Sequence, residues 1–164
     1  MFWTFLRATI VFLITFSSVS AFLWAGGATK DEEKTLREWR KQRVVAPDSS
    51  PAYTDDSIAT AMAMFGIQVP SNADKPYFDR TLSDRGLTIK RAWHKNAEVK
   101  IGPAAFSSWS LLGSTLAHEL EVHCRQNFFM ISILDRLGLD GTVIAERQAY
   151  KHELIMAERF GLSK

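Results

Sequence analysis

Residues Ser114–His123 read STLAHELEVH, and this segment decides how the rest of the chain is interpreted. It places two imidazoles, those of His118 and His123, and the carboxylate of Glu119 inside one apolar, helix-prone stretch. Imidazole nitrogens and carboxylate oxygens are common zinc ligands in proteins. The segment therefore predicts a metal site on a helix.

The spacing of the two histidines decides whether they can share one ion. In the motif H-E-x-x-H the histidines lie four residues apart on one helical face and bind zinc, while the glutamate acts as general base. Here His123 comes one residue later. At about 100° per residue a step of five residues leaves His118 and His123 about 140° apart on a regular α-helix. A one-residue π-bulge would restore a common face, so the spacing indicates either a bulged ligand pair or an accident.

Length and composition favour one globular domain. The chain has 164 residues, of which 46% are hydrophobic, enough for a core of ordinary size. Twenty basic and eighteen acidic residues give a formal net charge of +2, and no basic stripe is present. These features do not favour nucleic-acid binding. A single cysteine, Cys124, excludes an intrachain disulfide.

The N-terminus predicts export. Arg7 precedes a short apolar run that ends in small residues at Val19–Ala21, as in a secretory signal peptide. Apolar character continues, however, and residues 8–25 approach the roughly 20 residues that span a bilayer. Residues 1–28 are therefore expected to be a signal peptide or an uncleaved membrane anchor. Either one places the remainder outside the cytoplasm: periplasmic, anchored in the inner membrane, or secreted.

The chain after residue 28 divides into two parts. Residues 29–50 are expected to form a charged, solvated helix and a linker that contains Pro47. Residues 51–164 are expected to form the domain. Its first helix should begin after a cap at Thr54 and end at Gly66.

The remaining patterns predict a small hairpin and two long helices. Apolar and polar residues alternate over 86–93 and again over 97–102, which is typical of two short strands joined at residues 94–96. A helix capped by Ser107, Ser108 or Ser110 should carry the His-Glu segment to about Phe128. A final helix should run from about Thr142 to Phe160 and close on Gly161. The fold class is therefore α+β, mainly helical with a small β-hairpin.

A third ligand is expected on the last helix. Zinc hydrolases use three protein ligands and leave one position open. Glu146 is the candidate, since a helical hairpin would bring it back against the motif helix. Tyr150 and Glu153 follow on the same face. Tyr150 could donate a hydrogen bond to a developing oxyanion, and Glu153 could orient His118 or His123.

Residues 98–153 resemble the zincin-like metallopeptidases whose third ligand is a glutamate. Residues 116–126, LAHELEVHCRQ, are similar to the LAHELxH..Q helix of small bacterial zincins and zincin-like toxin domains. Residues 146–153, ERQAYKHE, are similar to their E-x-x-A-Y-x-x-E helix. The resemblance implies a zincin-like domain over 51–164, with His118, His123 and Glu146 as Zn²⁺ ligands and Glu119 as base. The inserted residue departs from the family pattern, although dipeptidyl peptidase III enzymes share the H-E-x-x-x-H form.

These observations predict an exported zinc-dependent hydrolase that cleaves a peptide or cell-wall peptide by metal-activated water. The alternative is a non-catalytic envelope protein, tethered through residues 8–25, that uses a degenerate zincin scaffold to bind a partner. A delivered toxin domain agrees poorly with the export signal. Three further residues receive lesser roles: Cys124 is expected to be a small buried hydrophobe, and His94 and His152 are expected at the surface. His94 is the first substitute if Glu146 is not a ligand.

Overall fold

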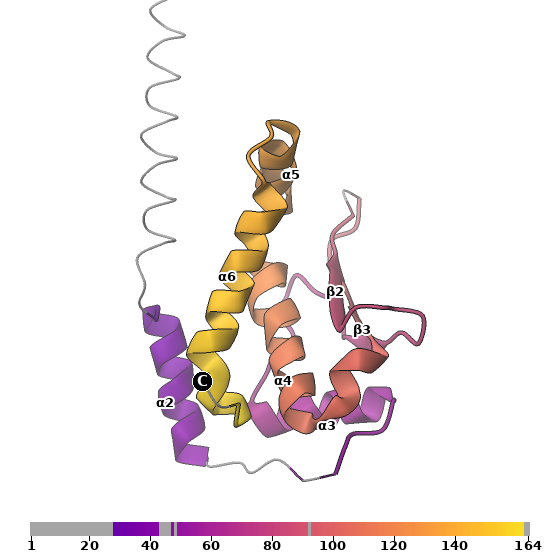
Figure 1. The fold of residues 1–164 in the computed structure, drawn as a ribbon, viewed down its shortest axis with the longest axis vertical. Helices are drawn as coiled ribbons and strands as arrows, with labels where there is room; N and C mark the ends of the chain where they lie inside the picture. The colour runs from indigo at the N-terminus through magenta and orange to yellow at the C-terminus, as the bar shows by residue number, and fades with distance from the viewer. Residues whose placement is uncertain (1–27, 43–46, 48, 92, 163–164) are drawn as a thin grey trace, which may run out of the picture. The chain divides into compact units, whose positions relative to one another are not determined.

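The computed structural model describes residues 28–42, 47, 49–91 and 93–162. The predicted signal peptide or anchor lies almost entirely outside the described residues. Within the described ranges, no helix has the length and apolar content that a membrane crossing requires. The described chain is an α+β fold, mainly helical with a small three-stranded sheet (Figure 1).

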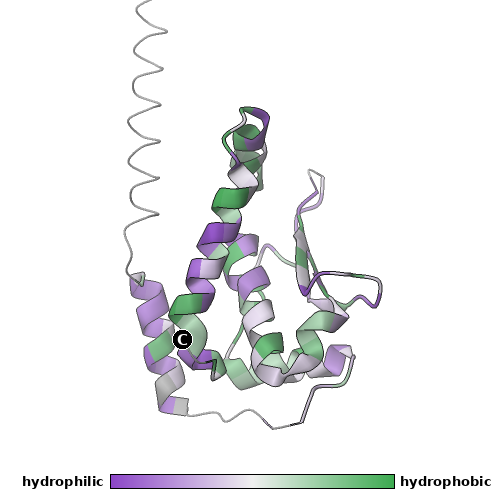
Figure 2. Cartoon of the chain, in the orientation of Figure 1, coloured by the Kyte–Doolittle hydropathy of each residue, from purple (hydrophilic) through white to green (hydrophobic). Residues whose placement is uncertain are grey.

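Helix α2 (Lys30–Gln42) confirms the helix predicted in the charged stretch. It is hydrophilic over most of its length (Figure 2), and Arg37 pairs with Glu33 at 3.3 Å one turn away. Leu36 packs against the core as a partly buried residue. Such i,i+4 pairs add only a few tenths of a kcal/mol each, so contacts with the rest of the fold must supply the helix with most of its stability.

Helix α3 (Asp55–Phe65) begins and ends where the sequence predicts. The Thr54 side chain accepts a hydrogen bond from the Ser57 amide, which caps the first turn. At the other end Gly66 adopts φ 63°, a left-handed conformation that glycine reaches without a Cβ penalty. Ile58 and Phe65 of this helix are buried in the core.

The sheet has the strand order β1-β3-β2. Strands β2 (Gly86–Ile89) and β3 (Glu98–Ile101) pair antiparallel and confirm the predicted hairpin, although β2 ends four residues before Trp93. Val99 and Ile101 of β3 point into the core, while Glu98 and Lys100 are only partly buried. Strand β1 (Tyr77–Phe78) pairs parallel with β3 and was not predicted. Strand β2 is thus an edge of the sheet.

The motif helix is shorter than predicted and contains two changes of pitch. Helix α4 (Trp109–Ala117) is capped by Ser108, whose side chain accepts from the Leu111 amide. It continues as a π-helix over His118–Val122, here called the π-turn, and then as a 3₁₀ turn over His123–Arg125. The prediction that the helix runs to Phe128 is wrong, because the backbone becomes extended at Gln126.

Two further helices complete the chain. Helix α5 (Phe128–Arg136), capped by Asn127, was not predicted as a separate element. Helix α6 (Gly141–Met156) continues as a 3₁₀ turn over Ala157–Phe160 and closes on Gly161 at φ 66°, as predicted. Helix α6 lies beside α4 (Figure 1), packs against α5 and contacts the π-turn. The main core lies among α3, α4, β3 and the C-terminal turn.

Candidate metal centre

The π-turn brings the two motif histidines onto one face. The backbone amide of His123 donates to the carbonyl of His118, five residues earlier, and to that of Glu119. This i→i+5 bond defines π geometry and adds one residue to the turn. The two imidazoles consequently lie with Nε2 atoms 2.9 Å apart. The structure therefore has the π-bulge that one of the two alternatives required.

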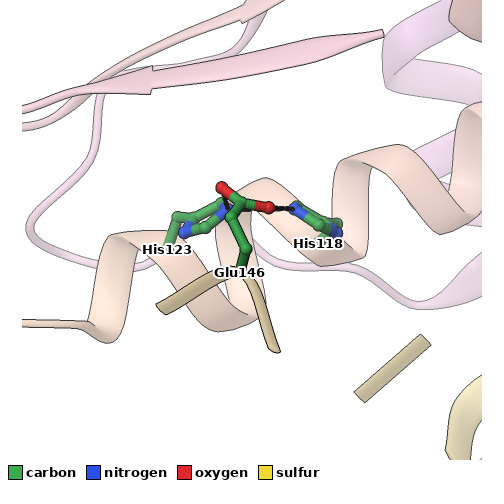
Figure 3. Close-up of side chains that lie close together, drawn as sticks. All are labelled: His118, His123 and Glu146. Carbon is green, nitrogen blue, oxygen red and sulfur yellow. Dashed lines mark hydrogen bonds and ion pairs between the residues drawn. The ribbon is translucent and has the colours of Figure 1, made fainter. Parts of the chain in front are cut away.

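Glu146 reaches the same point from α6. One carboxylate oxygen lies 3.6 Å from Nε2 of His118, and the other lies 3.3 Å from Nε2 of His123. The three side chains point toward one another (Figure 3). One ligand atom from each residue lies within 4.8 Å of the others, a group that could hold a metal ion. Both imidazoles are buried, whereas the Glu146 side chain is 42% exposed.

The second nitrogen of His118 fixes the orientation of its ring. Nδ1 of His118 lies 2.6 Å from a carboxylate oxygen of Glu153. Glu153 is the residue predicted to orient one of the histidines. A carboxylate accepts hydrogen bonds, so Nδ1 is the donor, and Nε2 faces His123 and Glu146. Carboxylate–histidine pairs of this kind orient metal ligands.

His123 is held in the same way by a residue that was not predicted. The Gln126 amide donates through Nε2 to the Ala145 carbonyl at 2.9 Å and to Gln148 at 3.0 Å. Its Oε1 therefore remains to accept a hydrogen bond from Nδ1 of His123 at 2.8 Å. Both histidines thus direct Nε2 toward the cluster. The contact between Gln126 and His123 could not be read from spacing alone, because Gln126 faces His123 only after the 3₁₀ turn.

This arrangement favours a positive charge near Glu146. The two Nε2 atoms and the Glu146 carboxylate lie within 2.9–3.6 Å of one another, and either a proton on one imidazole or a bound metal ion would balance the carboxylate charge there. Two nitrogens at about 2.0–2.1 Å from a tetrahedral zinc ion are about 3.4 Å apart, so the Nε2 atoms, 2.9 Å apart here, would separate by about 0.5 Å to bind one. Burial lowers the pKa of His118, but the hydrogen bond with Glu153 and the nearby carboxylates outweigh it and raise that pKa.

Glu119 lies beside the cluster, buried against strand β2. Its carboxylate accepts a hydrogen bond from the Thr88 hydroxyl at 2.6 Å. Burial raises the pKa of Glu119, and the Thr88 bond and the two imidazoles only partly oppose that shift. A Cβ atom at Gly86 would come within 2.5 Å of the Glu119 carboxylate. The absence of a side chain at Gly86 therefore gives the Glu119 carboxylate its space.

The cluster opens into a cleft of about 470 Å³. Strand β2 contributes Gly86, Leu87 and Thr88 to one wall, and helices α5 and α6 contribute residues to the other. Tyr150 lies at this second wall with its ring 5.6 Å from that of His118. Its side chain is half exposed. All five predicted site residues line this one cleft: His118, Glu119, His123, Glu146 and Tyr150.

The residues given lesser roles lie elsewhere. Cys124 belongs to the buried core, as predicted, and burial raises the pKa of its thiol to about 11. His94 is exposed near the β2–β3 connection and does not join the cluster. The prediction that His152 lies at the surface is wrong: its ring is buried between carboxylates of Glu121 and Glu32.

Fold and site together define an α+β protein whose His-His-Glu cluster could bind a metal ion. In comparisons with known proteins, no family model matches the chain, and no curated protein or solved structure is significantly similar to it.

Proposed function

We propose that this protein is a zinc-dependent hydrolase of the zincin-like type. The observation that supports the proposal best is the convergence of His118, His123 and Glu146 at one wall of a cleft, with an acceptor on each Nδ1 atom. Two imidazoles and one carboxylate are a ligand set of catalytic zinc sites, which keep a fourth position open. The half-exposed Glu146 side chain agrees with such an open position.

Each residue of the cleft has a role in the proposed reaction. When bound, a zinc ion would activate water and polarise the scissile carbonyl. Glu119 would accept the proton of the attacking water and transfer it to the leaving nitrogen. The Thr88 hydroxyl, at 2.6 Å, would hold the Glu119 carboxylate in place. Tyr150 would donate a hydrogen bond to the carbonyl oxygen as negative charge develops on it.

A peptide is the substrate that this cleft fits best. Strand β2 is a sheet edge and lines the cleft with Gly86, Leu87 and Thr88. An extended peptide can pair with such an edge through its backbone. Since the N-terminal sequence predicts export, the substrate would be an envelope protein or a cell-wall peptide. The protein would act in the periplasm, at the inner membrane or outside the cell.

Elemental analysis of the full-length protein tests metal binding. Wild type is expected to hold about one zinc ion per chain, and His118→Ala is expected to hold little, because tetrahedral sites need each protein ligand. His94→Ala is the matched control, since its imidazole is exposed and outside the cluster. Equally low zinc in all three proteins would instead favour a non-catalytic scaffold that binds a partner.

The Glu119→Gln variant tests hydrolysis. It keeps the size of the side chain but removes the base, so the rate on casein or peptidoglycan peptides should fall by about 10²–10⁴-fold. Zinc content should be unchanged, because Glu119 is not a ligand in this proposal. A variant that hydrolyses these substrates at the wild-type rate would remove Glu119 from the mechanism.

A further inference from the structure

A second buried polar cluster lies behind the π-turn. It consists of Glu121, in the π-turn itself, together with Glu32, His152 and Arg159. It is called the rear network below. Its members come from three elements far apart in the chain: α2, the π-turn, and α6 with the turn that follows it. None of the four belongs to the His-His-Glu cluster.

Arg159 connects the rear network to the end of α3. Its guanidinium binds both carboxylate oxygens of Glu121, at 2.8 and 3.0 Å, and its Nε donates to the Phe65 carbonyl at 2.9 Å. The side chain is 1% exposed. Bidentate Arg–carboxylate pairs are geometrically specific, so this pair fixes the π-turn relative to the end of α3.

Helix α6 holds the π-turn at a second place. His152 contacts the Glu121 carboxylate at 3.1 Å, and the next residue, Glu153, contacts His118 at 2.6 Å. Two consecutive residues of α6 therefore hold two positions of the same turn. The other nitrogen of His152 lies 2.9 Å from Glu32 of α2.

These contacts limit the pitch of the motif helix. Closing the π-turn into an α-turn would rotate the chain after it by about 100° relative to the chain before it. Because His118 is held by Glu153 and Glu121 by Arg159, the rotation would break one of those contacts or move His123 out of the cleft. The π form is the one in which the contacts and the paired imidazoles are present together.

We propose that Glu121 is a positioning residue, which with Arg159 and His152 stabilises the π-turn and so keeps His118 and His123 on one face. The inference rests on the proposed function, because it concerns how the same metal site is held. Glu121 touches neither substrate nor metal in this account. It acts only through the backbone of the turn that carries both histidines.

The test must separate positioning from general stability. Glu121→Gln keeps the shape of the side chain but removes its charge. Glu121→Leu combined with Arg159→Met removes both charges, and replacing a whole buried ion pair by apolar residues is often neutral for stability. The control is Asp79→Asn combined with Lys100→Met, which removes a partly buried ion pair of the sheet, 3.0 Å long and away from the cleft.

Zinc affinity of the full-length proteins is measured by competition with a chromogenic chelator, and melting temperature is measured without metal. Glu121→Gln and the apolar double variant should bind zinc about 10–100-fold more weakly, as when partners of ligands are removed. The control should stay within about twofold of wild type. A folded apolar double variant with wild-type zinc affinity would overturn the proposal. If that variant does not fold, wild-type affinity in Glu121→Gln overturns it.

A metal-free measurement keeps this inference separate from the proposed function. Nitrogen-15 spectra of the imidazoles report the Nδ1–H donors of His118 and His123, which Glu153 and Gln126 accept. If wild type binds no zinc, the proposed function fails. The Nδ1–H signals of His118 and His123 then decide whether Glu121 positions the two histidines. Loss of the His123 signal in the apolar double variant, with retention in the control, supports positioning; retention in both overturns it.

Discussion

The His-His-Glu cluster and the rear network share the π-turn but differ in how their charges are balanced. In the rear network each carboxylate has a cationic or hydrogen-bonding partner, as Glu121 has in Arg159 and His152. In the His-His-Glu cluster the Nε2 atoms of His118 and His123 face each other at 2.9 Å, beside the half-exposed Glu146 carboxylate. Removing one partner of a closed, buried network destabilises a fold, whereas potential metal ligands that converge at the wall of a cleft mark a candidate functional site.

The first prediction concerns a change that disturbs the cleft and leaves the rear network as it is. Gly86→Ala places a Cβ within 2.5 Å of the Glu119 carboxylate, which must then move away from Thr88. A displacement of about 1 Å in a catalytic group can reduce the rate about 10²-fold. Hydrolysis should fall by that order while zinc content and the rear network are unchanged. Unaltered activity would show that the position of Glu119 is not critical.

The second prediction compares stability in the two regions. Arg159→Met leaves the Glu121 carboxylate buried without its main partner, which should lower the free energy of unfolding by about 3–5 kcal/mol. Glu146→Gln changes a side chain that is 42% exposed and should alter it by no more than about 0.5 kcal/mol. Urea unfolding of the metal-free proteins measures both. Equal losses would contradict the distinction between a structural and a ligand-binding cluster.

The third prediction concerns the partner of His123. Gln126→Met removes the acceptor of Nδ1 and the hydrogen bonds to α6. Zinc affinity should fall about 10–100-fold, measured by chelator competition. Gln68→Met, at an exposed position, is the matched control and should bind zinc as wild type does. The same loss in both variants would show that the effect is unrelated to His123.

The smallest effect is expected in the pH dependence of the melting temperature. It concerns the rear network alone, because it is measured on a variant of His152. Burial lowers the pKa of His152, but its hydrogen bonds with Glu121 and Glu32 outweigh burial and raise that pKa above the ordinary value. A raised histidine pKa stabilises the fold below the unfolded value of about 6.5, and this contribution is lost as the pH rises through the folded value. The melting temperature of His152→Gln should lie a few degrees below that of wild type in mild acid and approach it in mild alkali. A difference in melting temperature between His152→Gln and wild type that does not change with pH would contradict a raised pKa of His152.

Local signals explain the parts of the fold that could be predicted. Helix α3 was predicted between Thr54 and Gly66 because cap and stop residues act over one turn. The same holds for the end of α6 at Gly161. Strand β1 was missed because two residues carry no period, and its pairing with β3 joins positions 23 residues apart, Tyr77 and Lys100.

The candidate site also has a part that local signals predict and a part that depends on contacts between distant residues. The five cleft residues could be named because motif spacing and helical periodicity place them, and the anomalous spacing left a π-bulge as one of two alternatives, the one that the structure shows. His152 was misplaced, because its neighbours Glu32 and Glu121 come from distant parts of the chain. Arg159 was overlooked for the same reason, because Phe65 and Glu121 are distant in the chain. Gln126 ends the quoted LAHELxH..Q pattern only three residues after His123, but its contact with His123 depends on the 3₁₀ turn between them.

Anomalous diffraction at the zinc edge, from crystals of the full-length protein grown with zinc, tests the central claim most directly. The claim is that a π-turn and a facing helix bring His118, His123 and Glu146 to one cation. The account predicts a single strong peak about 2.0–2.2 Å from both Nε2 atoms and a Glu146 oxygen. A peak elsewhere, or none at this cluster, would contradict it.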